Sequence, residues 1–316
     1  PRSTPKPSSA ASDVYKRQVL ARSAEIGIRE SFQRNSEGCR RKIESDDGEG
    51  NATVDAMVDL QIIGGGKMGA ALLGGLLRQG REPQGILVVE PLASRGEELI
   101  QTYDVKVSAE VQPATASIIA TKPDTVVTVA AEAAAAGTDR LLSVAAGVTL
   151  ASIDEATGGA VPVIRAMPNT PALVGQGAAA ICGNETSTST DLQWAEEILG
   201  AVGTVVRTDE KLLDAVTGLS GSGPAYVFLV AEAMIDAGVM TGLSRPIATE
   251  LAIQTLLGAA TLLTDGKPPA ELRADVTSPG GTTAAGLREL ESHGLRAAFA
   301  AAIEAASRRS QELGRN

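Results

Sequence analysis

The sequence predicts an α/β protein in which a mostly parallel sheet, covered by helices on both faces, is followed by an all-helical segment. Strand-like apolar runs alternate with helical patterns from residue 58 to about residue 145. The glycine-rich stretch Gly64–Gly69 joins the first such run to the first helical pattern. Beyond Asp214 only helical patterns follow. The alternation is typical of a parallel sheet, and the later helices indicate a second domain.

The glycine-rich stretch has the G-x-G-x-x-G spacing of a nucleotide-binding turn, between a strand at 59–63 and a helix at 67–79. Gly64 permits the tight turn, Gly66 lets a pyrophosphate approach the backbone, and Gly69 lets the helix pack on the strand. The helix N-terminus then faces the anion. The alternative is a glycine-rich loop without a ligand. The flanking elements and Glu90, an acid at the end of the next strand, favour a Rossmann-like dinucleotide-binding domain.

The other elements of this domain follow in order. Strands are expected at 86–90, 116–120 and 141–145, with helices near 94–102 and 124–136. A strand at 161–166 leads into Met167–Pro171, and strand-like stretches at 178–182 and 204–207 flank a helix near 190–201. Because ligands of such sheets bind beyond the carboxyl ends of the strands, the loops Gly64–Gly69, Thr121–Pro123 and Ala145–Gly147 are expected to share one edge.

The second domain is expected to be helical, with the boundary near 214, so that the two domains are 57–214 and 215–316. Ser220–Pro224 opens a helix over 225–237, and Ser244 stands at the N-cap position of the next helix, 247–263. Further helices are expected near 269–275, 283–292 and 295–312. The 247–263 helix is apolar on most faces and must be buried within the domain or between subunits.

Residues 1–56 do not resemble the rest. They are rich in Ser, Arg and Pro and have no clear period, and the first methionine of the chain is Met57. The stretch Ser8–Gln18 resembles translated adaptor sequence, so we expect a disordered or non-native leader. An organellar transit peptide is the alternative, since residues 14–43 are Arg-rich.

Composition excludes several classes of function. A net charge of -10 argues against nucleic acid as the main partner. Apolar runs are broken by charges, Gly or Pro before the roughly 18 residues of a membrane span. Cys39 and Cys182 have no metal spacing, which argues against zinc or a disulfide framework and fits a reducing, cytoplasmic compartment. The single histidine, His293, stands at a helix end, so no His-based triad or acid–base pair is expected.

Four motifs together resemble the pyrroline-5-carboxylate reductase family, over about residues 58–313. They are Ile62–Gly69, Arg165–Pro171, Asp214–Tyr226 and Asp275–Thr283. The resemblance implies NAD(P)H-dependent reduction of the C=N bond of 1-pyrroline-5-carboxylate to L-proline. It also implies that the all-helical domain is a dimerisation domain that interlocks two subunits, and that the homodimer can assemble further.

The resemblance implies site residues as well. The hydroxyl of Thr283 is expected beside the ring nitrogen, as the catalytic group. The substrate-binding residues are expected to be Glu210, Ser278, Gly280, Gly281, Thr282 and Thr283. The cofactor-binding residues are expected to be Gly64, Gly65, Gly66, Lys67, Met68, Gly69, Glu90, Thr121, Lys122, Ala146 and Asp275. No metal ligand is expected, because a cyclic imine accepts hydride as its iminium without a strong acid or a metal.

Several alternatives stay open at this point. The cofactor is NADPH or NADH: Glu90 suits a free 2′-hydroxyl, while Arg95 would soften the repulsion of a 2′-phosphate. The Ser278–Thr283 turn offers backbone donors for a carboxylate, or is an ordinary cap in which Thr282 or Ser278 caps the helix. The rival functions are a related hydroxyacid or imine dehydrogenase and a non-catalytic nucleotide-sensing protein.

Overall fold

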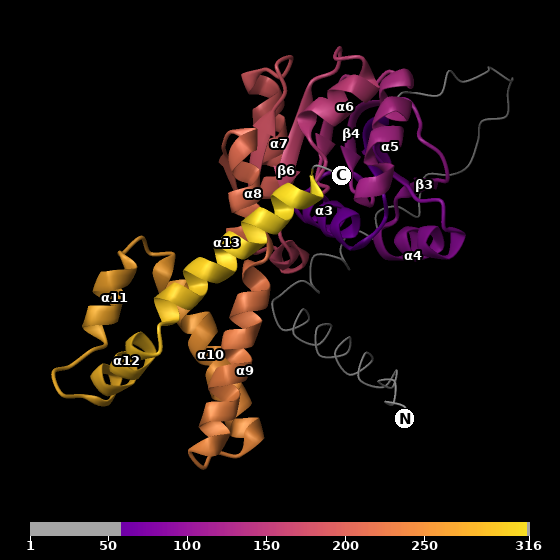
Figure 1. Ribbon diagram of the computed structural model, residues 1–316. Coiled ribbons are helices and arrows are strands. Elements are labelled where there is room, and N and C mark those ends of the chain that lie inside the picture. Colours follow the sequence, from indigo (N-terminus) through magenta and orange to yellow (C-terminus); the bar gives the residue numbers. More distant parts are fainter. Residues whose placement is uncertain (1–57, 315–316) are drawn as a thin grey trace, which may run out of the picture. The chain divides into compact units, whose positions relative to one another are not determined.

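The computed structural model describes residues 58–314, and Figure 1 shows their arrangement. Predictions about the leader lie outside these residues. The sheet-forming part comes first along the chain, and helices α9 to α13 follow it. An α/β sheet followed by a helical part is the fold class predicted from the sequence.

The sheet has eight strands in the order β3-β2-β1-β4-β5-β6-β7-β8. Strands β1 to β6 are parallel, whereas β7 runs antiparallel to β6, and β8 pairs parallel with β7. The strands are β1 (Val58–Ile63), β2 (Ile86–Val89), β3 (Lys106–Ser108), β4 (Ala114–Ile119), β5 (Arg140–Ser143), β6 (Val163–Met167), β7 (Gly177–Gly183) and β8 (Gly203–Arg207). The parallel part matches the prediction for residues 58–145, and β3 is a strand that the sequence pattern did not reveal.

Five helices accompany the strands: α3 (Lys67–Arg78), α4 (Ala93–Tyr103), α5 (Pro123–Ala135), α6 (Leu150–Thr157) and α7 (Ser189–Gly200). Single-turn 3-10 segments lie at Pro83–Gly85 and at Thr170–Val174, called η1 and η2. The sequence pattern missed α6. Its start is defined by the Thr149 hydroxyl, which accepts a hydrogen bond from the Ser152 N–H, a typical N-cap.

Two aliphatic cores lie on the two faces of the sheet. Leu60 and Ile62 of β1 belong to one core, and Ile63 belongs to the other, because successive side chains of a strand point to opposite faces. The first core includes Leu72 and Leu73 of α3. The second includes side chains of α5 and α6. Both faces of the sheet are therefore covered, as the near-continuous apolar strands require.

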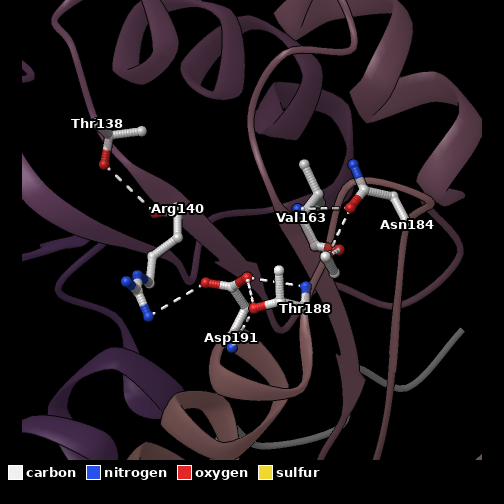
Figure 2. A network of polar contacts seen from close by, with 7 residues as sticks. Thr138, Arg140, Val163, Asn184, Thr188 and Asp191 are labelled. Atoms are coloured by element: carbon white, nitrogen blue, oxygen red, sulfur yellow. Dashed lines mark hydrogen bonds and ion pairs between the residues drawn. The ribbon is translucent and has the colours of Figure 1, made fainter.

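A polar network fixes α7 to the amino edge of the sheet, and Figure 2 shows it. Thr188 and Asp191 form a reciprocal capping box at the start of α7. The other oxygen of Asp191 lies 3.2 Å from the Arg140 guanidinium at the first residue of β5. Asn184 accepts a hydrogen bond from the Val163 N–H at the start of β6. The network is thus built at the opposite edge from the glycine-rich turn, and its role is structural.

The helical part begins with η3 (Glu210–Leu212) and α8 (Leu213–Val216), followed by the π-helical turn η4 (Thr217–Gly221). The helices that follow are α9 (Gly223–Met240), α10 (Arg245–Leu263), α11 (Pro269–Asp275), α12 (Thr282–Ser292) and α13 (Leu295–Leu313). Helix α13 runs back to pack along η4 and α8, as Figure 1 shows. The predicted boundary near 214 falls inside α8, whose Leu213 is buried in the sheet core; the boundary itself stays a prediction.

Helices α9 and α10 pack on each other and leave large apolar side chains exposed. Gly238 meets Ala248 where the two helices cross, and Ala248 and Ala252 are the buried residues of α10. Phe228 and Leu229 of α9 and Leu251 and Leu257 of α10 are each more than half exposed. Exposed apolar surface on this scale marks an interaction surface. Within residues 58–314 the 247–263 helix is therefore mostly unburied, and its burial between subunits stays a prediction.

Two helical segments, Glu210–Met240 and Arg245–Leu263, are long and apolar enough to cross a membrane by length and composition alone. The sequence prediction concerned uninterrupted apolar runs, and charged residues do interrupt both segments, such as Asp236 in the first and Glu250 in the second. Helices that pair in a subunit interface have the same composition, so these two segments do not by themselves indicate a membrane protein. The charged side chains of Arg245 and Glu250 at the start of α10 are also costly inside a bilayer.

Candidate active site

The turn from β1 into α3 has the geometry of a phosphate-binding loop. Gly64 has φ +108°, and a Cβ there would lie 2.7 Å from the Ala120 carbonyl oxygen. A Cβ at Gly69 would collide with the Gly64 carbonyl, so both positions require glycine. A Cβ at Gly66 would meet nothing within 4 Å, and no side chain caps α3. The first turn of α3 thus presents its N–H groups to open space, which suits an anion.

Glu90, at the end of β2, lies beside this turn. One carboxylate oxygen accepts a hydrogen bond from the Gly65 N–H at 3.0 Å, and the other accepts one from the Leu92 N–H. The Arg95 Nε donates to the Gly65 carbonyl at 2.7 Å, and the same guanidinium pairs with Glu98. The predicted acid and its neighbouring arginine therefore both contact the backbone of the glycine turn, where the ribose next to a pyrophosphate would lie.

Two cavities flank the loop Thr121–Pro123 at the carboxyl edge. One, of about 670 Å³, is lined by Gly64, Pro91 and Thr121 together with side chains of α5. The second, of about 450 Å³, is lined by Pro123, Ala146 and Gly147 on the sheet side. The structure thus brings the predicted residues Gly64, Thr121 and Ala146 to one edge, as expected. Lys122 stands there too, at the N-cap position of α5 with an exposed side chain.

The helical part contributes the far wall of the second cavity. Thr217 and Ser222, from either end of the π-turn, line it together with Ala306, Arg309, Ser310 and Leu313 of α13. The Ser310 hydroxyl donates to Asp214 at 2.6 Å and so holds α13 against α8. Sequence reasoning did not place Thr217, Ser222 or α13 at the site. Thr217 and Ser222 belong to the motif Asp214–Tyr226, whose Ser220–Pro224 part reads equally well as a helix start.

The turn before α12 is a second open helix start. Gly280 has φ +70°, and the Gly281 N–H donates to the Ser278 carbonyl at 3.0 Å. Gly281 is the N-cap residue, and no side chain caps α12. The alternative in which Thr282 or Ser278 caps this helix is therefore wrong. Ser278, Thr282 and Thr283 are all exposed, and Thr283 lies in the first turn of α12.

The two open helix starts are not brought together in this chain. Helix α12 packs on α13, whereas the glycine turn lies at α3, well apart from α12 in Figure 1. Asp275, the last residue of α11, forms an ion pair with Lys267 and so also lies on the helical side. Within one chain, the Ser278–Thr283 turn predicted for the substrate is separate from the residues predicted for the cofactor at the sheet edge. Asp275, although predicted for the cofactor, lies on the side of the substrate turn.

Glu210 lies apart from the Ser278–Thr283 turn as well. Its Oε1 pairs with the largely buried Arg165 guanidinium at 2.7 Å and accepts the Leu150 N–H at 2.8 Å. The carboxylate thereby joins β6, the start of α6 and η3. Sequence reasoning missed Arg165 as its partner, although Arg165 opens the second motif.

A thiol stands beside this ion pair. Cys182 of β7 is opposite Arg165 of β6 in the sheet register. Burial first, and the Glu210 charge second, raise the pKa of the Cys182 thiol to about 12, while the Arg165 charge acts in the opposite direction. A buried thiol of such high pKa is unreactive at neutral pH, so Cys182 is not a nucleophile.

Comparisons with known proteins identify the family. Residues 210–313 match the family described as "Pyrroline-5-carboxylate reductase dimerisation", and residues 59–147 match "NADP oxidoreductase coenzyme F420-dependent". The chain is 46% identical to the pyrroline-5-carboxylate reductase of Synechocystis sp. over 265 residues, which cover 82% of this chain and 99% of the relative. The chain belongs to the pyrroline-5-carboxylate reductase family. The recognition made from the four motifs is confirmed.

Solved structures of the family have the same fold. A pyrroline-5-carboxylate reductase from Coxiella burnetii is 35% identical and superposes with a TM-score of 0.78, over 81% of this chain and 98% of that one. The Plasmodium falciparum enzyme with NADP bound is 30% identical, with a TM-score of 0.71 over 81% and 98%. A Rossmann-like domain followed by a helical dimerisation domain, as in a pyrroline-5-carboxylate reductase, is therefore the fold of this chain.

The family assignment also bears on the rival dehydrogenase. Hydroxyacid enzymes of similar architecture need a Lys or His as acid and base. In residues 215–314 the candidates for this role are Lys267 and His293. Lys267 is paired with Asp275, and His293 is the exposed C-cap residue of α12, with its Nδ1 2.8 Å from the Glu289 carbonyl oxygen. Neither lies at the sheet edge that carries the glycine turn, so the geometry does not favour a hydroxyacid dehydrogenase.

Proposed function

We propose that this chain is an NAD(P)H-dependent oxidoreductase that reduces the C=N bond of 1-pyrroline-5-carboxylate to L-proline, the last step of proline biosynthesis. One observation carries the proposal: a chain of this family has two glycine turns, Gly64–Gly69 and Gly280–Gly281, and each opens onto a helix start that no side chain caps. An uncapped helix start is a site for an anion. The reaction needs two such sites, one for a pyrophosphate and one for the carboxylate of the imino acid.

The residues at the first site fit a dinucleotide. The space in front of Gly66 is open, and a side chain on that residue would occupy it. We assign the pyrophosphate to the turn Gly64–Gly69, with Lys67 and Met68 lining it. The adenosine ribose lies toward Glu90, and the nicotinamide end lies toward Thr121, Lys122 and Ala146. When bound, the reduced nicotinamide supplies the hydride.

At the second site the chain's groups bind the substrate and stabilise its charge. The backbone N–H groups of Gly280, Thr282 and Thr283 and the Ser278 hydroxyl bind the carboxylate, while the Gly281 N–H closes the turn onto the Ser278 carbonyl. The Thr283 hydroxyl is placed to hydrogen-bond the ring nitrogen as the iminium becomes an amine. Because the iminium already carries its proton, the reaction requires a hydrogen-bond partner and not a strong acid.

Glu210 is assigned to the substrate and Asp275 to the cofactor, but within one chain neither lies beside the other residues assigned to the same ligand. Glu210 uses Oε1 for Arg165 and Leu150, which leaves Oε2 as the oxygen that can reach a ligand. Asp275 is close in sequence to the Ser278–Thr283 turn. It can therefore contact a cofactor only if that turn also lies next to the cofactor. Both are therefore proposed as residues that meet their ligand in the assembled protein.

The two sites are proposed to meet between two copies of the chain. One chain holds them apart, and α9 and α10 expose a broad apolar surface of the kind a homodimer buries. The Ser278–Thr283 turn of one subunit would then close the cofactor edge of its partner. Assembly of such dimers into a larger homo-oligomer is consistent with this arrangement. The same burial accounts for the composition of the two apolar helices without a membrane, and it fits a cytoplasmic enzyme.

The test is a steady-state assay of the purified chain with 1-pyrroline-5-carboxylate, comparing NADH with NADPH. The expected result is consumption of the reduced cofactor together with an equal amount of L-proline. Glu90 predicts that NADH serves well and that it can serve better than NADPH. Cofactor binding without any proline would instead support a nucleotide-sensing protein.

A further inference from the structure

The start of α9 contains a carbonyl that its own helix cannot satisfy. In a regular α-helix, the Ser220 carbonyl would accept a hydrogen bond from the N–H of residue 224. Residue 224 is proline, which has no N–H. The chain here forms a π-turn instead, with the Ser222 N–H donating to the Thr217 carbonyl at 2.8 Å. The Ser220 carbonyl therefore needs a donor from elsewhere.

Asn169, in the loop between β6 and β7, supplies that donor. Its Nδ2 donates to the Ser220 carbonyl at 3.0 Å, and its Oδ1 accepts the Ala178 N–H at 2.8 Å. The two bonds fix the orientation of the amide, since reversing it would place like groups against each other on both sides. Asn169 is 9% exposed, so water is a poor substitute. One side chain thus joins the sheet to the first turn of the helical part.

The π-turn is held tightly between two other segments. A Cβ at Gly221 would lie 2.6 Å from the Met167 methyl carbon, two residues before Asn169. A Cβ at Gly218 would lie 2.6 Å from the Ile303 carbonyl oxygen of α13. A side chain at either glycine would collide with these neighbours, so the turn packs closely against Met167 and against α13. Asn169 adds a hydrogen bond to the Ser220 carbonyl of this closely packed turn.

The π-turn forms part of one wall of the second cavity. Thr217 and Ser222 stand at its two ends, and both line the cavity beside Ala146 and Gly147. Within residues 58–314, the Ser222 hydroxyl makes no hydrogen bond to another side chain. π-helical turns are frequent at functional sites. A hydroxyl with unused hydrogen-bonding capacity at this wall suits an amide group of a ligand.

The order of the strands indicates which part of a dinucleotide would reach this wall. The adenosine side lies at β2, the pyrophosphate turn follows β1, and β4 and β5 come next in the sheet. A dinucleotide that extends across these loops brings its nicotinamide end to Ala146 and Gly147 after β5. The carboxamide of that ring would then face Ser222.

We propose that Asn169 is a positioning residue for the nicotinamide end of the cofactor. It replaces the hydrogen bond that Pro224 removes, and it thereby holds the π-turn so that Ser222 faces the carboxamide. This inference rests on the proposed function, since it takes a nicotinamide dinucleotide as the ligand. The motifs Arg165–Pro171 and Asp214–Tyr226 act as one unit through this contact.

A rescue experiment tests the proposal. Asn169→Ala leaves the Ser220 carbonyl without a donor, and we expect kcat to fall about 10-fold and the Kd for NADH to rise about 5-fold. In Asn169→Ala with Pro224→Ala, residue 224 regains an N–H that can bond to the Ser220 carbonyl. We expect most of kcat and of the NADH affinity to return in that double variant. Pro224→Ala alone is the matched control and should behave like the wild type.

The readouts separate positioning from folding. NADH affinity is measured by fluorescence titration without substrate, and each variant is also melted thermally. Unchanged kcat and NADH affinity in Asn169→Ala would overturn the proposal, as would a double variant that regains its melting temperature but not its NADH affinity. If Asn169→Ala does not fold, Ser222→Ala takes its place, with weaker NADH binding at an unchanged melting temperature as the expected result. Unchanged binding there would overturn the proposal. A wild type that binds NADH but makes no proline would refute the proposed function alone.

Discussion

A charge at Leu257 on the outer side of α10 should separate the subunits without unfolding them. Leu257 lies on the opposite face of α10 from Ala248, which packs on α9, and Leu257 is 59% exposed in the single chain. Because residues 58–314 leave most of Leu257 exposed, Leu257→Asp should leave the monomer fold intact. The substitution should instead prevent the burial of this position in a subunit interface.

The size of the effect follows from that exposure. Full burial of a leucine side chain is worth about 1.5–3 kcal/mol, so the exposed part is worth roughly 0.9–1.8 kcal/mol per chain. A two-fold interface counts each residue twice, which gives roughly 2–3.5 kcal/mol per dimer. At 1.4 kcal/mol for each tenfold change, the dimer should weaken by roughly 30- to 300-fold. The cost of burying a carboxylate adds to this figure.

Light scattering at micromolar concentration measures the outcome, together with NADH titration and the imine assay. Leu257→Asp should be monomeric and should bind NADH, but it should lose most of its turnover, because the substrate turn of a partner is missing. Val174→Asp is the matched control: it adds the same charge to an exposed apolar side chain of the sheet part and should remain dimeric and active. An active Leu257→Asp monomer would refute the reasoning.

Three other substitutions test separate parts of the molecule. Glu90→Ser should raise the use of NADPH relative to NADH about 10-fold, since a hydrogen bond to a charged group is worth about 1.5–3 kcal/mol. Glu98→Ser is the control: it removes the ion pair with Arg95 but leaves Glu90 in place, and it should leave that ratio unchanged. Thr283→Ala should lower kcat/KM by about 10-fold, and Thr283→Ser should be mild, because one neutral hydrogen bond is worth about 0.5–1.5 kcal/mol; wild-type turnover in Thr283→Ala would remove this residue from the mechanism. Asp191→Asn should destabilise the fold by about 1 kcal/mol at pH 7 through loss of the capping box. Burial raises the pKa of Asp191, but hydrogen bonds from Thr188 and the Arg140 charge outweigh it, so the net pKa lies below its usual range. Its stabilisation is therefore complete above the unfolded pKa of about 3.9 and is lost as the pH falls through the lowered pKa, and urea melts of both forms should converge there.

Local patterns predicted most of the sheet and the glycine turn. The strands β1, β2, β4 and β5 are apolar runs bounded by turn residues, and the roles of Gly64, Gly66 and Gly69 depend only on nearby backbone. The three-residue strand β3 and the short helix α6 are too brief for a periodic signal. The reversal of β7 depends on how its chain returns along β6, and residue types do not encode that direction.

Contacts between residues distant in the chain could not be predicted in the same way. Glu210 was matched to a substrate role from its motif, but its ion pair with Arg165 spans 45 residues. Asn169 and Ser220 are 51 residues apart, so neither motif alone revealed why both are needed. The separation of the Ser278–Thr283 turn from Gly64–Gly69 likewise depends on how α12 and α13 pack.

Subunit complementation tests most directly whether the site is built from two chains. Gly66→Val should fold, because the position is open, but its side chain should exclude the pyrophosphate. Ser278→Glu should fold as well, because Ser278 is exposed, but its charge should repel the substrate carboxylate. Each variant alone should be inactive. After the subunits are mixed and exchanged, half of the dimers should be mixed with one intact site each, which restores about a quarter of wild-type proline formation. A mixture that stays as inactive as its components would contradict a site shared between subunits.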